Sequence, residues 1–301
     1  MKLVISASPH IDSGATTRKI MGDVLIALCP ALIAAIVIFG WRALLVTAVC
    51  AAACVFFEWG FEKLCHKEST IGDLSAVVTG VILAYNLPVS IPLWQAVFGC
   101  LVAIVAVKQL FGGIGKNFAN PALVGRIVLF LSFSKTMTAW VFPDAVSSAT
   151  PLAQLAAGQK PELWTLLLGN HGGCIGETCA LALLLGGAYL LLRGVITWQT
   201  PVCFVGTVFV LSLILGQDAV RQILSGGLLL GAFFMATDYV TAPQTCWGRA
   251  LFGIGAGLLT CLIRFYGSYA EGVSFAILFM NILTPYLSKW TETKPFGGVA
   301  A

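Results

Sequence analysis

Long runs of apolar residues, separated by short polar or glycine- and proline-containing segments, are the feature that most constrains how this chain folds. A helix that crosses a bilayer needs roughly 20 predominantly apolar residues, and fewer where its ends are buried in protein. Only 10% of the 301 residues are charged, whereas a typical soluble domain has about 25%. The chain therefore lacks the charge to cover a water-exposed surface, and we predict an all-α polytopic membrane protein.

About ten stretches fit membrane-spanning helices. They cover residues 22–40, 43–60, 74–88, 93–111, 121–134, 179–193, 200–216, 223–237, 248–266 and 272–288. The third, fifth and eighth are short or are interrupted by Gly and Pro. Each half of the chain holds a short Gly-containing helix followed by a Pro-containing turn, which predicts two inverted five-helix repeats with broken helices, as in many transporters.

This pattern divides the chain into three parts. Residues 1–134 hold the N-terminal tail and the first repeat, and residues 135–178 form an extracytoplasmic loop. Residues 179–301 hold the second repeat and a short cytoplasmic tail. With the N-terminus inside, ten spans return the C-terminus to the same side, and most Lys and Arg residues then lie in the cytoplasm, as expected for membrane proteins.

Charge and cysteine usage exclude several other classes of protein. The net charge of +4 forms no basic stripe, so we expect no nucleic-acid partner. The ten cysteines include no Cys-X-X-Cys pair, and the three histidines are isolated, so we expect no metal site and no catalytic triad. Cys174 and Cys179 share one loop, where they either form a disulfide or remain free thiols.

The segment "DAVSSATPL" (residues 144–152) stands out in the long loop. Its Asp-X-X-Ser-Ser-Ala-Thr core has the form that a flavin transferase reads, with the Thr150 hydroxyl attacking FAD so that FMN stays on the side chain as a phosphodiester. Asp144, Ser147, Ser148 and Ala149 supply the other motif positions. The alternative is structural, in which Ser147 and Thr150 cap a helix that begins with the following proline.

A similar segment near the start, "DSGATT" (residues 12–17), offers Thr16 as a second candidate. The position six residues before Thr16 is His10, whereas the same position relative to Thr150 is an aspartate. The predicted topology also separates the two, because Thr16 lies on the cytoplasmic side and Thr150 outside. We therefore prefer Thr150 as the flavin carrier.

Several longer segments carry a family resemblance. They are "SPHI" (8–11), "IMGDVLIALCPA" (20–31), "GKNFANPALVGR" (115–126), "DAVSSATPL", "GCIGET" (173–178) and "FMATDYVTAP" (234–243). With these segments the chain resembles the D subunits of Rnf complexes, the ion-translocating ferredoxin:NAD+ oxidoreductases. It is similar, more distantly, to the B subunit of the sodium-pumping NADH:quinone oxidoreductase. One departure is Ser148, where that family commonly has glycine.

The resemblance implies a multi-pass subunit of the bacterial cytoplasmic (inner) membrane with both termini cytoplasmic and the flavin site extracytoplasmic. It implies covalent FMN on Thr150 as a phosphothreonyl ester, and a second, non-covalent flavin (riboflavin). The implied partners are the lipid bilayer, a flavin transferase, a neighbouring FMN-carrying subunit, and the other membrane and peripheral subunits. The complex would couple ferredoxin/NAD+ electron flow to Na+ or H+ transport. This chain has no catalytic residue of its own for that reaction.

Two further positions are candidates for contact with a flavin or an ion. The segment "NFANP" (117–121), around Ala119 and Asn120, interrupts the apolar pattern, and irregular backbone at membrane depth must line a cavity or be buried in protein. Asp238 lies beside the break that follows the eighth span.

Other ionisable groups lie at or near the predicted span ends. Asp23 and Arg126 are weaker candidates, since ionisable groups at membrane depth often have functions. For Lys108 we expect the side chain to snorkel to the headgroups.

Three functions remain open from these residues. The first is an electron-transfer subunit of a membrane redox pump, with FMN on Thr150. The second is a small-solute channel or transporter with no redox role, which the broken helices allow. The third is a membrane anchor that organises redox subunits without carrying electrons.

Overall fold

The computed structural model describes residues 15–140, 149–267 and 272–292, and within these ranges the chain is helical with no strand. The longer helices are α1 (Thr17–Phe39), α2 (Trp41–Leu64), α3 (Ser75–Tyr85), α4 (Leu93–Leu101), α5 (Pro121–Ser132), α9 (Ala180–Leu192), α10 (Gln199–Ile214), α13 (Cys246–Tyr266) and α14 (Val273–Trp290). The shorter elements are η1 (Ile71–Asp73), α6 (Ser134–Met137), α7 (Pro151–Ala156), α8 (Leu163–Leu168), α11 (Ala219–Leu224) and α12 (Leu228–Leu230), with π-helical η2 (Val102–Gln109) after α4 and η3 (Gly231–Met235) after α12. Each of the predicted apolar stretches contains a helix, which confirms the all-α architecture.

The outer surface of the bundle suits lipid. Helices α1, α2 and α13 are long and apolar enough to cross a membrane. Large apolar side chains point outward, including Val37, Leu192 and Ile214, which are 80%, 88% and 72% exposed. Trp41 and Trp247 are also exposed at helix ends, where indole rings prefer the membrane–water interface. The chain is therefore a polytopic membrane protein.

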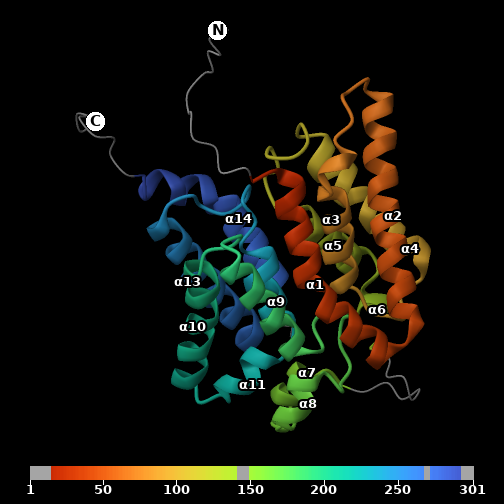
Figure 1. Cartoon of the computed structure of the whole chain (residues 1–301). Coiled ribbons are helices and arrows are strands. Elements are labelled where there is room, and N and C mark those ends of the chain that lie inside the picture. The colour runs from red at the N-terminus through yellow and green to blue at the C-terminus, as the bar shows by residue number, and fades with distance from the viewer. Residues whose placement is uncertain (1–14, 141–148, 268–271, 293–301) are drawn as a thin grey trace, which may run out of the picture.

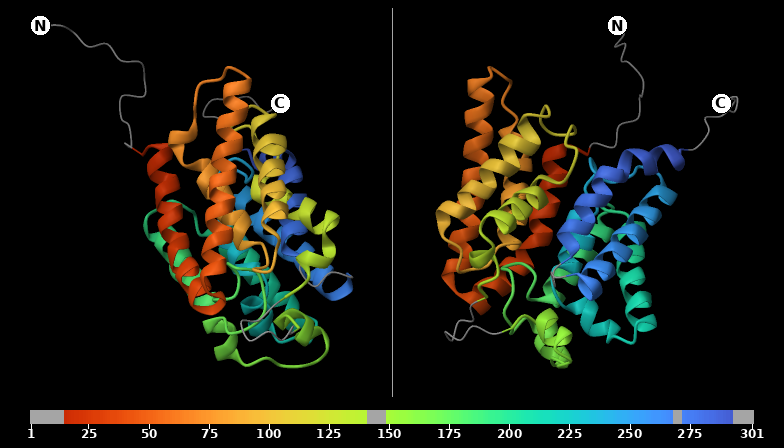
Figure 2. Two further views of the ribbon diagram at one scale, coloured as in Figure 1. Left: turned by 90° about the vertical axis from the view of Figure 1, so that its right-hand side faces the viewer. Right: turned by 180° about the vertical axis from the view of Figure 1, so that it is seen from behind.

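The helices form two groups that lie side by side (Figure 2). In the first group α2 packs on α3 and α4; in the second α10 packs on α13, and α13 on α14. Helix α1 contacts α9, and α14 contacts α5, so the two groups share an interface. Close packing inside the second group depends on Gly253, where an added Cβ would lie 2.7 Å from the Thr200 carbonyl oxygen. The predicted inverted relation between the two halves stays a prediction.

Two predicted spans are irregular for local reasons. The span that begins at Leu93 changes from α-helix to π-helix at Val102, a feature that frequently marks functional sites. The predicted span 223–237 is broken at Gly226, whose φ of +66° is a conformation that glycine adopts without steric cost. The broken span continues as α12 and η3 and ends at Met235.

The two ends of the molecule differ in what they carry (Figure 1). The start of α1 and the end of α14 lie at one end, which we call the terminal face. The short helices α7 and α8 lie at the opposite end, which we call the loop face. The division of the chain at residues 134 and 178 stays a prediction, but α7 and α8 do lie outside both helix groups in Figure 1.

Candidate functional site

Thr150 is the N-cap residue of α7 at the loop face. Its hydroxyl accepts a hydrogen bond from the Ala153 backbone N–H at 3.3 Å, and its backbone is extended, as an N-cap requires. Pro151 occupies the first helical position, where its lack of an N–H has no cost. The side chain is only 7% exposed. The structural alternative therefore describes the local geometry correctly, and a capping role does not exclude a modified hydroxyl.

Helix α7 packs against Gly226, which lies between α11 and α12. A Cβ added at Gly226 would lie 2.5 Å from Leu152 Cδ1 and 3.2 Å from Arg264 Nη2. Arg264 donates to the Gln222 carbonyl oxygen at 2.7 Å and to the Ser225 carbonyl oxygen at 3.1 Å. A guanidinium group therefore lies close to the side chain that anchors the start of α7.

The remaining motif positions are only partly described. Asp144, Ser147 and Ser148 lie outside the described residues. Ala149 is exposed, and its carbonyl oxygen accepts a hydrogen bond from Gln154 Nε2 at 3.2 Å.

Thr16 has nearly the same local geometry at the other end of the molecule. It caps α1 by accepting a hydrogen bond from the Lys19 backbone N–H at 3.3 Å, and it is exposed. The two threonines thus share a capping role but lie on opposite faces (Figure 1).

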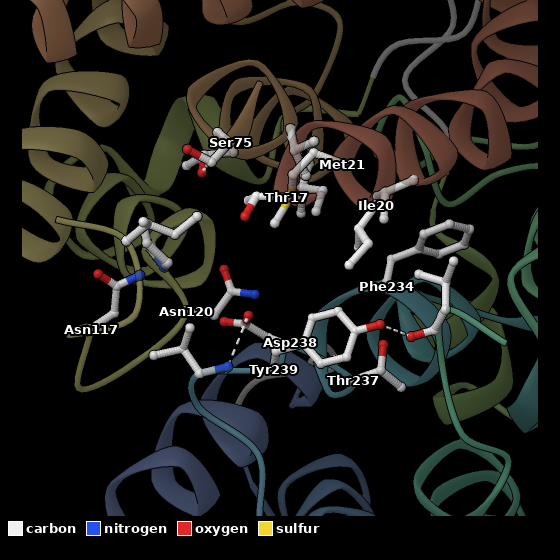
Figure 3. A pocket seen from close by; sticks show the side chains of 18 of the residues that line it. Thr17, Ile20, Met21, Ser75, Asn117, Asn120, Phe234, Thr237, Asp238 and Tyr239 are labelled. Carbon is white, nitrogen blue, oxygen red and sulfur yellow. Dashed lines mark hydrogen bonds between the residues drawn. The ribbon is translucent and has the colours of Figure 1, made fainter. Parts of the chain in front are cut away.

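A cavity of about 340 Å³ opens between the two helix groups near the terminal face. Its wall is mostly apolar, with Ile20, Met21 and Phe234 among its residues, and Asn120 and Asp238 supply polar groups (Figure 3). Pockets of roughly 300–1,000 Å³ with a few polar groups are typical of small-molecule sites. The apolar runs in the sequence carry no signal for this cavity, because its wall combines residues from both halves.

Asn120 and Asp238 are held by hydrogen bonds within the cavity wall. Asn120 caps α5 by accepting from the Ala122 backbone N–H at 3.0 Å, and its Nδ2 donates to the Met235 carbonyl oxygen at 3.4 Å. Asp238 accepts from Thr241 Oγ1 at 3.1 Å and from the Val240 backbone N–H at 3.4 Å. Burial raises the pKa of Asp238, and these hydrogen bonds lower it in part. The structure thus brings together two candidates that lie far apart in sequence, while their role stays a prediction.

Arg126 lies buried where the two helix groups meet. Its Nη1 donates to Asn86 Oδ1 at 3.0 Å and to Ser274 Oγ at 2.6 Å, and its Nη2 approaches Cys174 Sγ at 3.8 Å. These contacts join α5 to the end of α3, to α14 and to the loop before α9. Arg126 does not line the cavity, so the structure does not bring it together with Asn120 and Asp238.

Asp23 connects the first helix to the second group. Its carboxylate accepts from Tyr189 Oη at 3.0 Å and from Arg193 Nη2 at 3.4 Å. The contact fixes α1 against α9, and it leaves Asp23 outside the cavity.

The expectation that Lys108 snorkels to the headgroups is wrong. Lys108 is 2% exposed, and its Nζ lies 2.6 Å from Oε1 of Glu58, which is fully buried. The partner lies on α2, fifty residues earlier, so spacing along the helix that carries Lys108 cannot reveal it. The signal in the sequence was a charge in one apolar stretch and an opposite charge in another.

The structure describes the cysteines of the loop before α9 and side chains that could bind a metal. Cys174 and Cys179 do not form a disulfide, and Cys179 Sγ donates to the Leu167 carbonyl oxygen at 3.5 Å. Within the described part of the chain, His, Cys, Asp and Glu form no group of three that could hold a metal ion.

Comparison with known proteins identifies the family. The model of the NQR2, RnfD, RnfE family matches residues 4–297. The chain belongs to this family. It is 46% identical to the D subunit of the Na+-translocating ferredoxin:NAD+ oxidoreductase complex of Acetobacterium woodii, over 99% of this chain and 96% of that protein. It is 41% identical to the D subunit of the proton-translocating ferredoxin:NAD+ oxidoreductase complex of Clostridium ljungdahlii, over 97% and 96% of the two chains.

A third member of the family is more distant. The D subunit of the ion-translocating oxidoreductase complex of Halorhodospira halophila is 36% identical over 97% of this chain and 94% of its own length. These full-length matches bear out the resemblance that the sequence segments indicated. The first two relatives are named for different ions, so similarity alone does not decide the ion.

Proposed function

We propose that this chain is the D subunit of an Rnf-type ion-translocating ferredoxin:NAD+ oxidoreductase and that it carries electrons through FMN bound covalently to Thr150. The full-length match to D subunits of such complexes supports the first part. The observation that carries the second part is the position of Thr150 at the start of α7 on the loop face, opposite both described chain ends. A transferase that works outside the cell would meet Thr150 and not Thr16.

The surroundings of Thr150 fit a phosphodiester. A phosphate on the hydroxyl keeps an oxygen acceptor beside the Ala153 N–H, which is 3.3 Å away. When bound, the flavin supplies the electron-transfer chemistry.

The cavity near the terminal face is the candidate site for the second, non-covalent flavin. Its volume and mostly apolar wall suit a flat aromatic ring. The polar edge of such a ring carries both hydrogen-bond donors and acceptors, which Asn120, Thr237 and Asp238 complement. These residues would hold and orient the ring at the interface of the two helix groups.

The partners follow from the role. During maturation the loop face would meet the flavin transferase, and during electron transfer it would meet a neighbouring FMN-carrying subunit. The other subunits of the complex and the lipid would cover the helix surfaces, with both termini in the cytoplasm of a bacterial inner membrane. The ion, Na+ or H+, and its pathway are separate from these assignments.

In-gel flavin fluorescence tests the covalent site. The chain is produced with a flavin transferase and fully denatured, and the wild type is compared with Thr150→Ala and Thr16→Ala. The two variants are matched, because each removes a capping hydroxyl that accepts from an N–H three residues later at 3.3 Å. Fluorescence lost only in Thr150→Ala supports the proposal. A wild type without fluorescence, alongside an active transferase, refutes it and favours a solute channel or transporter.

A further inference from the structure

A chain of hydrogen bonds leads from the terminal face to the cavity. It begins at Thr70, which is exposed, and continues through the buried side chains of Glu62 and Glu58 on α2. It then passes to Lys108 on η2 and to Ser75 at the start of α3. Lys108 and Ser75 both line the cavity.

Each link is within hydrogen-bond distance. Lys108 Nζ donates to Glu58 Oε1 at 2.6 Å, to Glu58 Oε2 at 2.9 Å and to Ser75 Oγ at 2.6 Å. Thr70 Oγ1 lies 3.0 Å from Glu58 Oε1 and 2.5 Å from Glu62 Oε1. These three donor bonds use all the protons of an ammonium group, so Lys108 is fixed between Glu58 and the cavity wall.

The Thr70 hydroxyl lies between the two carboxylates. A hydroxyl has one hydrogen, so Thr70 donates to only one carboxylate at a time and can pass a proton from one to the other. Glu58 already accepts from Lys108 and, at 3.0 Å, from Gln109 Nε2. Glu62 Oε1 also accepts from the Thr70 backbone N–H at 3.2 Å. Its second oxygen is buried without a hydrogen-bond partner, so it is open to a proton donor.

Charged side chains surround this chain of hydrogen bonds. Glu58 and Glu62 face the interior from α2, Asp73 accepts from the Ser75 hydroxyl at 2.5 Å, and Lys67 Nζ donates to the Gln109 carbonyl oxygen at 3.4 Å. Lys108 is the cation in direct contact with Glu58, at 2.6 Å.

We propose that Thr70, Glu62, Glu58, Lys108 and Ser75 form a proton relay that supplies protons from the terminal face to the occupant of the cavity. The inference rests on the proposed function, in which that occupant is the second, non-covalent flavin. On reduction of that flavin, a proton from the relay would neutralise the negative charge that each added electron brings.

The steps of the transfer conserve protons. The Ser75 hydroxyl turns from Asp73 to the cavity and gives its proton, and Lys108 replaces that proton across the 2.6 Å contact. Lys108 is reprotonated through Glu58 by the Thr70 hydroxyl. Glu62, which lies beside the exposed Thr70, takes a proton from water and passes it to the Thr70 hydroxyl, which returns the relay to its starting state.

The test measures proton uptake directly. The full chain is purified in the Thr150→Ala background, so that only non-covalent flavin remains, and its flavin is extracted and quantified first. A photochemical one-electron reductant then reduces the flavin, and the absorbance changes of the flavin and of a pH-indicator dye are followed together. We expect about one proton taken up per electron in the parent, with both Glu62→Gln and Thr70→Val slowing uptake at least tenfold.

Two matched variants should leave the rate unchanged. Glu68→Gln removes an exposed carboxylate from the same loop. Thr138→Val removes an exposed hydroxyl that donates to the Ser134 carbonyl oxygen at 2.8 Å and lies outside both the relay and the cavity. Formate, a small diffusible acid, should restore the rate in Glu62→Gln, which a purely structural defect would not allow.

The possible failures are distinguishable. Parent protein that binds flavin but takes up no proton on reduction overturns the relay, as do relay variants with parental rates. Absence of extractable flavin in the parent overturns the assignment of the cavity to a flavin, and the relay with it. The covalent site on Thr150 is tested separately by the fluorescence experiment, and its outcome does not depend on the relay.

Discussion

Removal of the Glu58 carboxylate should strongly destabilise the first helix group. Glu58 is fully buried and Lys108 is 2% exposed, and they form an ion pair at 2.6 Å. Glu58→Gln leaves the ammonium group of Lys108 without a counter-ion in an apolar interior. Breaking a buried pair in this way costs about 3–5 kcal/mol. Because native proteins are stable by only about 5–15 kcal/mol, we expect a large fall in unfolding temperature.

A double-mutant cycle measures the interaction energy between Glu58 and Lys108 separately from their contacts with other residues. Lys108→Met removes the cation and keeps an unbranched side chain, so it leaves the Glu58 carboxylate uncompensated and should also cost about 3–5 kcal/mol. The double variant Glu58→Gln/Lys108→Met has no buried charge at either position. We expect it to be considerably more stable than either single variant, because replacing both partners of a buried pair is often nearly neutral.

The buried cysteines of α2 report unfolding. Cys50 and Cys54 are fully buried, so a thiol-reactive dye in mild detergent reacts with them when the helix group opens on heating. Glu68→Gln, which changes an exposed carboxylate, is the control and should stay within about 0.5 kcal/mol of the wild type. If the effects of the two single changes simply add in the double variant, Glu58 and Lys108 do not act as a pair and the reasoning is refuted.

Three further outcomes follow from the geometry. Gly226→Ala should displace α7 and increase proteolysis beside it, because φ is +66° and the new Cβ would lie 2.5 Å from Leu152 Cδ1. The left-handed backbone conformation alone costs an alanine about 1–2 kcal/mol. Gly206→Ala is the control and should leave proteolysis unchanged, because the added Cβ has no atom within 4 Å. Burial raises the pKa of Asp238, so equilibrium dialysis with riboflavin should show affinity falling as the carboxyl ionises with rising pH, whereas Asp238→Asn should show no such fall. Burial lowers the pKa of His171, so the unfolded chain binds more protons below about pH 6.5; stability should fall with acidification, and His171→Gln should reduce that fall in thermal melts at about pH 7.5 and 5.5.

The architecture was predictable because it depends on local composition. A bilayer requires a minimum length of apolar helix, and runs such as those ending at Phe39 and Leu64 indicate it directly. The start of α7 was also predictable, since Thr150 followed by proline is a local capping pattern. The ends of α12 and the π-helical segments η2 and η3 were not predictable, because no local capping or turn pattern in the sequence marks them.

The buried ion pair and the cavity were beyond sequence reasoning for a different reason. Glu58 and Lys108 are each an isolated charge in an apolar stretch, and only the contact between α2 and η2 makes them partners. Asn120 and Asp238 meet on one cavity wall although more than a hundred residues separate them. Such pairings come from tertiary packing, which a single sequence does not encode by spacing.

The helix breaks and the cavity nevertheless have a common cause. Backbone that leaves a helix at membrane depth must find partners in protein or face a cavity, because lipid offers no hydrogen bonds. Asn120 caps α5, and its Nδ2 donates to the carbonyl oxygen of Met235, the last residue of η3. The side chain at one helix break therefore satisfies a backbone carbonyl at the other, and both breaks place polar side chains in the cavity wall (Figure 3). Apolar helices without these breaks would pack together and leave no polar wall, so the short spans that look imperfect in the sequence are what gives this chain a partly polar cavity between its two helix groups.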